Sequence, residues 1–185
     1  MVMRISGPPW VVDIPPNGNV LTLHNSSPNS TLNDTSGGAG VAATPFPVPY
    51  TIKGGVMQPA SAIRMWGGID WAGPANSKNI IVKVGPASGD WNSASSVYSG
   101  QSGLSTPLFS TVGLLLWGDN ATNAQRGNPA NTVHFMNASN ASVAGQTTLD
   151  TTMDWNIWIG IQFGTLNGGN TATLRHVIIE HVPAP

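Results

Sequence analysis

From residue 62 to the end, the chain consists of short runs in which apolar and polar residues alternate, separated by clusters of Gly, Pro and Asn. Alternation with a period of two places successive side chains on opposite faces of an extended strand, so this pattern favours half-buried β-strands over helices. Short strands at such spacing are typical of a β-sandwich or barrel. We predict strands at residues 63–71, 79–85, 96–99, 112–118, 132–137, 155–164 and 171–182.

The strand predicted at 155–164 has the clearest alternation. Its expected core face carries Trp155, Ile157, Ile159, Ile161 and Phe163. The opposite face, with Asn156, Trp158, Gly160 and Gln162, is mixed and therefore tolerant of different surroundings. The turn at 167–170, Asn-Gly-Gly-Asn, consists of residues that accept positive φ, so we predict that the strands at 155–164 and 171–182 form a hairpin.

Composition excludes several classes of protein. Charged residues make up 8% of the chain, against roughly 25% in average soluble domains, and Glu180 is the single glutamate, so a helical protein is nearly excluded. A net charge of -1 removes the basic surface expected of a nucleic-acid binder or of a protein held on anionic lipid. With no cysteine there is no disulfide, thiolate site or thiol catalysis, while seven Trp argue for a packed core.

The first third of the chain differs in character. Residues 1–59 hold nine of the fifteen prolines, and proline cannot donate to a strand ladder. We therefore predict an extended Pro-rich N-terminal arm at 1–59, with short strands at 10–14 and 20–24 and a loop at 25–40, followed by a β-sandwich at 60–185. The N-terminal residues lack the apolar run of a secretion signal, and we expect no membrane span.

Motifs for catalysis are missing from the sequence. The string at 99–103, Ser-Gly-Gln-Ser-Gly, has the wrong spacing for a nucleophile elbow, and the glycine-rich string at 37–40 lacks the lysine and helix of a phosphate-binding loop. The carboxylates mostly stand beside Gly, Asn or Thr, as turn residues do. His176 and His181 are five apart on one predicted strand and so point to opposite faces, which disfavours a shared ion. We expect no enzymatic activity, no cofactor and no metal site within one chain.

The tryptophans are the remaining candidates for a site. Trp71 and Trp155 are in phase with isoleucines and are expected in the core. Trp10, Trp91 and Trp158 are the candidates for an interface or for stacking on a glycan, since exposed aromatic rings serve both purposes. Of these, Trp158 is the best candidate for an exposed or interface aromatic.

Four strings carry a resemblance to a known family. They are Ala-Ile-Arg-Met-Trp-Gly-Gly-Ile-Asp at 62–70, Ile-Ile-Val-Lys-Val-Gly at 80–85, Asp-Trp-Asn-Ile-Trp-Ile-Gly-Ile-Gln-Phe at 154–163 and Ala-Thr-Leu-Arg-His-Val-Ile-Ile-Glu at 172–180. In order and spacing they resemble the jelly-roll (tumour-necrosis-factor-like) domains of tailed-bacteriophage virion surface proteins: capsid decoration or cement proteins, head fibres and tail-fibre tips. In that family the second string would pair with the first, and the last two would form the final hairpin.

The resemblance implies an all-β antiparallel sandwich of jelly-roll type that assembles as a homotrimer. It also implies a structural role as a capsid decoration protein, bound to the major capsid protein on the outer capsid surface of a virion, with no catalytic residue or cofactor to transfer. An ion bound on the threefold axis by one His from each chain is a minor alternative. The alternative function is that of a receptor-binding or adhesin domain with a host glycan as partner.

Overall fold

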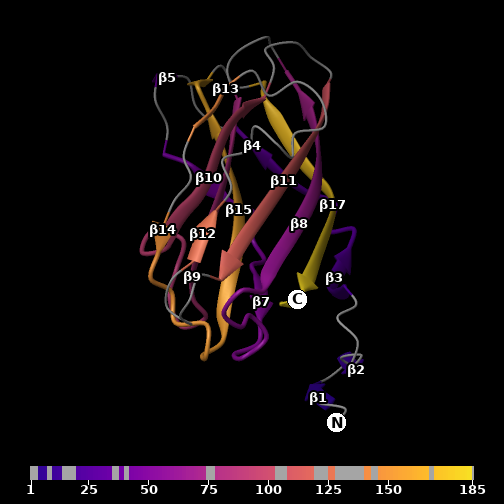
Figure 1. Ribbon diagram of the computed structural model, residues 1–185. Helices are drawn as coiled ribbons and strands as arrows, with labels where there is room; N and C mark the ends of the chain where they lie inside the picture. Colours follow the sequence, from indigo (N-terminus) through magenta and orange to yellow (C-terminus); the bar gives the residue numbers. More distant parts are fainter. Residues whose placement is uncertain are drawn as a thin grey trace.

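The computed structural model (Figure 1) describes residues 4–7, 10–13, 20–34, 38–39, 42–73, 78–102, 108–118, 125–127, 140–142, 146–166 and 169–184. In these ranges the chain is all-β, and no helix is long and apolar enough to cross a membrane. The strands are β1 Arg4–Gly7, β2 Trp10–Asp13, β3 Leu21–Ser26, β4 Ser30–Asn33, β5 Gly38–Ala39, β6 Thr44–Pro45, β7 Tyr50–Ile52, β8 Ala62–Ala72, β9 Lys78–Pro86, β10 Ser95–Ser102, β11 Leu108–Gly118, β12 Gln125–Gly127, β13 Asn140–Ser142, β14 Gln146–Thr147, β15 Trp155–Phe163, β16 Thr165–Leu166 and β17 Thr171–Val182.

Two antiparallel sheets pack face to face as a sandwich (Figure 1). The first, which we call the β17 sheet, has the order β14-β12-β11-β8-β17-β3, with β4 also paired to β17. The second, the β15 sheet, has the order β13-β10-β9-β15-β6, with β7 also paired to β15. The fold class predicted from the alternating pattern is therefore confirmed.

The strand order identifies the sandwich as a jelly roll. β3 and β4 both pair with β17 and together fill the first strand position, while β6 and β7 both pair with β15 and fill the second. The remaining positions, three to eight, are β8, β9, β10, β11, β15 and β17 in that order. The first position then pairs with the eighth, the second with the seventh, the third with the sixth and the fourth with the fifth. The sheet orders become 1-8-3-6 and 2-7-4-5, the arrangement of a long hairpin rolled into two facing sheets.

The core lies between the sheets and is formed by the apolar face predicted from the alternation. The inward side chains of β15, predicted as a core face, are at most 7% exposed: Trp155, Ile157, Ile159, Ile161 and Phe163. Opposite them, β8 contributes Ile63, Met65, Ile69 and Trp71, each at most 2% exposed. Interdigitated apolar side chains from two sheets about 10 Å apart make the stabilising layer of such a fold.

Strand β17 changes phase once along its length. Ala172 and Leu174 are buried, a register shift against β8 follows between Leu174 and His176, and then Val177 and Ile179 are buried. The extra residue, Arg175, is exposed. This β-bulge keeps an apolar row on the core side at both ends of a long twisted strand.

The predicted terminal hairpin is wrong. β15 pairs with β9, β6 and β7, whereas β17 pairs with β8, β3 and β4, so the two strands lie in opposite sheets. The pairing of β8 with β9, which the family resemblance implies, is also wrong, because these two strands lie in opposite sheets. An apolar row can be buried by facing another row across the core as well as by lying beside it, and alternation alone does not distinguish the two arrangements.

The predicted boundary at residue 59 is also wrong, because the sandwich begins near residue 20. β3, β4, β6 and β7 supply the first two strand positions of the jelly roll. Five core side chains precede residue 60: Phe46, Tyr50, Ile52, Val56 and Met57. What remains of the arm in the described residues is β1 and β2, which pair with each other and lie apart from the sandwich (Figure 1).

The loop predicted at 25–40 contains ordered pairing. β3 runs to Ser26, β4 occupies 30–33 and β5 pairs with β16. The Thr31 and Thr173 hydroxyls lie 2.8 Å apart across β4 and β17, and Leu32 packs on the core. Polar residues of weak strand preference are thus held extended by a long neighbouring strand. The other predicted strands are confirmed to within a few residues, except 132–137, which lies outside the described residues.

Candidate interaction surfaces

Part of the outer face of the β15 sheet is covered by its own chain. Trp158 is 6% exposed and Trp91 8%, and with Ala94 they form a small cluster outside the main core, against which Ala43 and Ile81 pack. The prediction that Trp158 is an exposed aromatic is therefore wrong. The segment that follows β9 folds back over this face and brings Trp91 onto it.

Gly160 makes room for the Trp91 ring. A Cβ atom at residue 160 would lie 2.4 Å from Trp91 Cη2, closer than real Cβ contacts. Trp91 Nε1 donates to the Ala43 carbonyl oxygen at 3.0 Å, and Lys83 Nζ lies 4.5 Å from the ring centroid and donates to the Trp91 carbonyl oxygen at 3.0 Å. The ring is thus fixed by packing, by a hydrogen bond and by a cation–π contact. Neither Trp91 nor Trp158 presents an open ring face on which a sugar could stack.

A short turn positions this segment. Asp90 Oδ1 accepts hydrogen bonds from the Ser93 backbone N–H and from its hydroxyl, both at 2.8 Å. These bonds hold the pKa of the Asp90 carboxyl below its usual value. Asp150 does the same with the backbone N–H and hydroxyl of Thr152, and its pKa is lowered by those bonds. The interpretation of these two carboxylates as turn residues is confirmed.

The third tryptophan candidate, Trp10, belongs to β2, where its backbone pairs with Gly7. The structure describes the backbone of Trp10 but not its side chain. A role for Trp10 in an interface or in glycan stacking stays a prediction.

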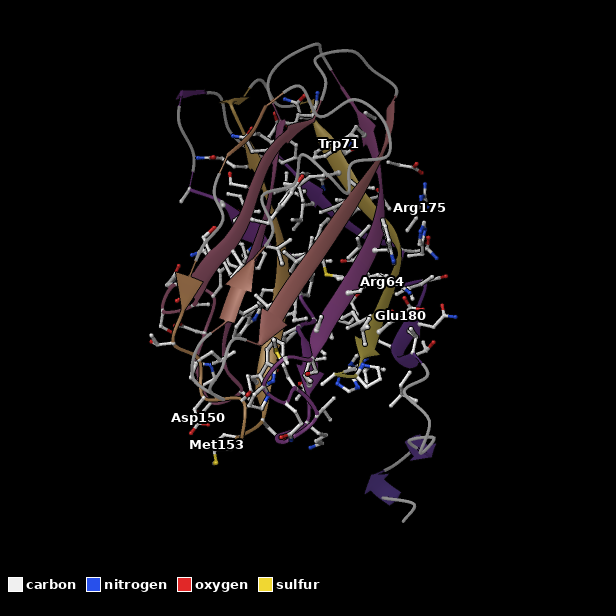
Figure 2. The ribbon with its side chains drawn as sticks, in the orientation of Figure 1. Arg64, Trp71, Asp150, Met153, Arg175 and Glu180 are labelled. Atoms are coloured by element: carbon white, nitrogen blue, oxygen red, sulfur yellow. The ribbon has the colours of Figure 1, made fainter. Side chains whose placement is uncertain are left out.

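The outer face of the β17 sheet carries two ion pairs, and we call it the ion-pair face. Arg64 on β8 and Glu180 on β17 are direct cross-strand neighbours, with Arg64 Nη2 2.7 Å from Glu180 Oε2. Further along, Arg175 Nε lies 2.5 Å from Asp70 Oδ2. Figure 2 shows Arg64, Glu180 and Arg175 along the same side of the sandwich.

Between these pairs lies an apolar cross-strand pair of residues. Trp66 and Ile178 are opposite each other in the register of β8 and β17, and both are partly exposed. The face therefore combines an aromatic and an aliphatic side chain with charges that compensate one another.

The basic side chains that the structure describes are all engaged within the chain. Lys53 pairs with Asp154 at 2.7 Å, Arg64 with Glu180 and Arg175 with Asp70. The remaining two are Lys83, held against Trp91, and Lys78, which is 1% exposed. The described surface thus offers no cluster of uncompensated positive charge to an acidic partner.

Two candidate ion ligands point away from each other. His181 is 6% exposed, on the core side of β17, whereas His176 lies on the opposite side, as the spacing predicted. Among the described residues no group of three or more His, Cys, Asp or Glu side chains gathers as metal ligands would.

One buried polar cluster was missed by sequence reasoning. Asp34, directly after β4, and Asn170, directly before β17, are 5% and 1% exposed and extend the pairing of these two strands. Asn170 donates from its backbone N–H to Asp34 Oδ1 at 2.8 Å and from Nδ2 to Asp34 Oδ2 at 2.5 Å. Lys78 lies close enough for the Asp34 charge to raise its pKa, against the larger lowering effect of burial. Asp34 lies at the end of a strand, as the turn interpretation expects, but its carboxylate is buried and bonded to Asn170.

Comparison with known proteins finds no relative by sequence: no family model and no curated protein matches the chain. By structure, the chain is similar to two solved structures of infectious bursal disease virus. For the Gt strain the TM-score is 0.41 at 9% identity, and for the Gx strain it is 0.30 at 8% identity. Each match covers 97% of this chain, which spans 38% and 45% of the two chains it matches. Because both TM-scores are below 0.5, the jelly-roll assignment rests on the strand order.

Proposed function

We propose that this chain is a virion structural protein, a decoration or cement protein that binds the major capsid protein on the outer surface of a tailed-phage capsid. The observation that carries the proposal is the jelly-roll strand order, which agrees with the fold implied by the sequence resemblance. The role is one of binding and stabilising, without enzymatic activity.

The distribution of charge supports a contact of a particular kind. Since each described basic side chain is engaged within the chain, the contact with a capsid depends on apolar packing and hydrogen bonds. Partly exposed apolar side chains such as Trp66 and Ile178, flanked by compensated charges, suit such a contact. Binding of this kind depends weakly on salt, because salt weakens only charge–charge interactions and this contact is made mainly without them.

A protein that binds the assembled capsid and not its separated subunits stabilises the assembly by mass action. At a free concentration one hundred times its Kd, the gain is about 2.7 kcal/mol per site. Many equivalent sites on one particle make a small gain per site large for the whole particle. Fixed charge pairs and a closed core leave the protein itself little to rearrange on binding.

Assembly as a homotrimer is part of the proposal and rests on the resemblance. Trp158 and Val177, apolar side chains that a second chain could have covered, are buried within the chain and give no support for it. We expect analytical ultracentrifugation of the full chain to give three times the chain mass of 19.2 kDa. A stable monomer at micromolar concentration that is also monomeric on particles would remove the trimer and leave the cement role in place.

The proposed function is tested by co-sedimentation of the purified full chain with capsid shells that lack it. We expect saturable binding, with nearly equal occupancy at about 50 mM and about 500 mM salt. At the higher concentration, salt screens interactions between exposed charges that are about 10 Å apart. Failure to bind shells, together with retention on a glycan array, would replace the cement role by the adhesin role.

A further inference from the structure

Three inward-facing rows of side chains end in polar residues at one end of the sandwich. On β9 the buried row is Ile80, Val82 and Val84, and Lys78 is its first member. On β17 the row that contains Ala172 and Leu174 begins with Asn170, and on β4 the row that contains Leu32 ends in Asp34. Lys78 pairs with Phe163 at the end of β15, and a Cβ atom at Gly73, five residues before Lys78, would lie 2.6 Å from Asn170 Cα, so the three row ends lie at the same end of the sandwich.

The three residues come from facing sheets. Lys78 belongs to the β15 sheet, while Asp34 and Asn170 extend the β17 sheet. Sheets that pack face to face lie about 10 Å apart, so a long side chain is needed to span the space between them. Lys78 is directed inward from one sheet, its side chain is long enough to reach the other, and the charge of Asp34, which belongs to that other sheet, acts on its pKa.

The environment is dry. The exposed fraction is 1% for Lys78, 5% for Asp34 and 1% for Asn170. The Trp71 side chain, 2% exposed, lies nearby on β8, because the next residue, Ala72, pairs with Thr171, which follows Asn170. Figure 2 shows Trp71 inside the sandwich near this end. Burial lowers the pKa of Lys78, which increases the share of its neutral, nucleophilic amine.

The backbone around Asn170 is held in place. Gly73 has a φ of +104°, and a Cβ atom there would lie 2.6 Å from Asn170 Cα. The Asp34 N–H donates to the Asn170 carbonyl oxygen at 3.0 Å. With the two side-chain bonds already described, Asp34 therefore fixes both the backbone and the amide of Asn170.

From this geometry we propose that Lys78 and Asn170 form an intramolecular isopeptide bond, with Asp34 as the proton-transfer residue, so that the two sheets become covalently joined at this end. A buried amine, a buried carboxamide and a carboxylate that hydrogen-bonds the amide nitrogen are the groups that such a self-modification needs. This inference does not depend on the proposed function.

The step balances without any other reactant. The neutral Lys78 Nζ attacks Asn170 Cγ, and a C–N bond forms while the carbonyl π electrons move onto Oδ1. Asp34 accepts a proton from Nζ and delivers a proton to Nδ2, the nitrogen that already contacts its Oδ2. The bond from Cγ to Nδ2 then breaks as the carbonyl re-forms, and ammonia leaves. The products are a secondary amide and one ammonia, with no change in oxidation state.

One physical effect favours the bond. Groups held together by a fold react as if present at effective molarities on the order of 10⁵–10⁸ M, which compensates for the low reactivity of an amide.

Intact-mass spectrometry of the purified full chain tests the inference. We expect a mass lower than that of the sequence by one ammonia. After trypsin digestion we expect residues 65–83, uncut after Lys78, to be joined to residues 127–175. An intact mass equal to that of the sequence, with residues 65–78 recovered as a free peptide, would overturn the proposal.

Variants separate this bond from other losses of ammonia. A succinimide at the Asn-Gly pairs 17–18 or 167–168 also loses ammonia, but it would persist in Lys78→Arg and leave the tryptic peptides unlinked. We expect Lys78→Arg, Asn170→Ala and the near-isosteric Asp34→Asn to have their full sequence masses. Lys83→Arg and Asn156→Ala, a lysine and a buried asparagine elsewhere, should keep the loss of ammonia. A linked peptide in Asp34→Asn would remove Asp34 from the proposed role.

Discussion

At the scale of single residues, the contact of Trp91 with Gly160 shows how one missing side chain allows a tryptophan ring to cover part of a sheet face. We expect Gly160→Ala to lower the free energy of unfolding by about 1–3 kcal/mol, because the new methyl group overlaps the Trp91 ring. The ring is fixed by Lys83 and by its hydrogen bond to Ala43, so it cannot easily move away. Denaturant unfolding followed by tryptophan fluorescence measures the change.

A double-mutant cycle provides the control. In a Trp91→Ala background the same Gly160→Ala substitution should cost much less, since the ring that it displaces is gone. An equal cost in both backgrounds would show that the ring is not the obstacle, and the Thr44 carbonyl oxygen, 3.0 Å from the same Cβ position, would be the next candidate.

His181 gives the protein a pH dependence of known sign. Burial lowers its pKa below the ordinary value of 6.5, and its Nε2 has no hydrogen-bond partner among the described residues. The unfolded chain therefore takes up a proton before the folded one does, so stability is unaffected above pH 6.5 and falls as the pH drops below it. Melting temperatures between pH 7.5 and 5 should decline in the native protein and decline less in His181→Leu.

The carboxylates act in a lower window. Hydrogen bonds lower the pKa values of Asp90 and Asp150, and the Lys53 contact lowers that of Asp154, from an ordinary value of 3.8. Their contribution is complete above that value and is lost below it. A decline between pH 7.5 and 5 that is identical in His181→Leu would assign the acid sensitivity to groups other than His181.

At the scale of elements, the N-terminal third divides near residue 20 and not near residue 59. Deletion of residues 1–19 removes β1 and β2, which pair with each other, and should leave a folded chain with a melting temperature close to that of the full protein. Deletion of residues 1–58 removes two of eight strand positions and five core side chains, and should give an unfolded or aggregated product. Circular dichroism and size-exclusion chromatography distinguish these outcomes, and a folded product of the longer deletion would contradict the jelly-roll strand order.

The sequence predicts the faces of the strands better than it predicts their partners. The alternation from Trp155 to Phe163 identifies a core face without any long-range information, because side-chain direction in a strand is a local property. Whether β17 lies beside β15 or across from it depends on the first two strand positions, which are formed by polar and Pro-rich segments with little alternation of their own. Tertiary pairing with β15 and β17 decides their structure.

The candidate site residues show the same difference between what is local and what depends on distant parts of the chain. Trp158 alternates correctly onto the outer face, but its covering comes from Trp91, more than sixty residues earlier, and nothing in the local pattern indicates it. Lys78 could have been found, since it stands in phase with Ile80 and Val82, just before the predicted strand at 79–85. A lysine in an inward phase signals a buried partner, and only the fold identifies that partner as Asp34.

At the scale of the whole molecule, the chain is a closed jelly roll whose described basic groups are satisfied internally. Ion pairs that solvent reaches contribute about 0–1 kcal/mol each, and the Arg64–Glu180 pair is partly exposed, so we expect Glu180→Gln to change the free energy of unfolding by about 1 kcal/mol or less. Their larger effect is that the described basic side chains offer no uncompensated positive charge to an acidic partner. A loss of several kcal/mol in the variant, measured by denaturant unfolding, would mean that the Arg64 pair supports the fold more than its exposure allows.

The central claim, that this protein stabilises a capsid by contacts that do not depend on charge, is tested most directly by the temperature at which capsid shells open. Shells lacking the protein are compared with shells to which the full chain has been added, at about 50 mM and about 500 mM salt. The account predicts a higher opening temperature with the protein, by the same increment at both salt concentrations. An unchanged opening temperature, or an increment that disappears at the higher concentration, would contradict it.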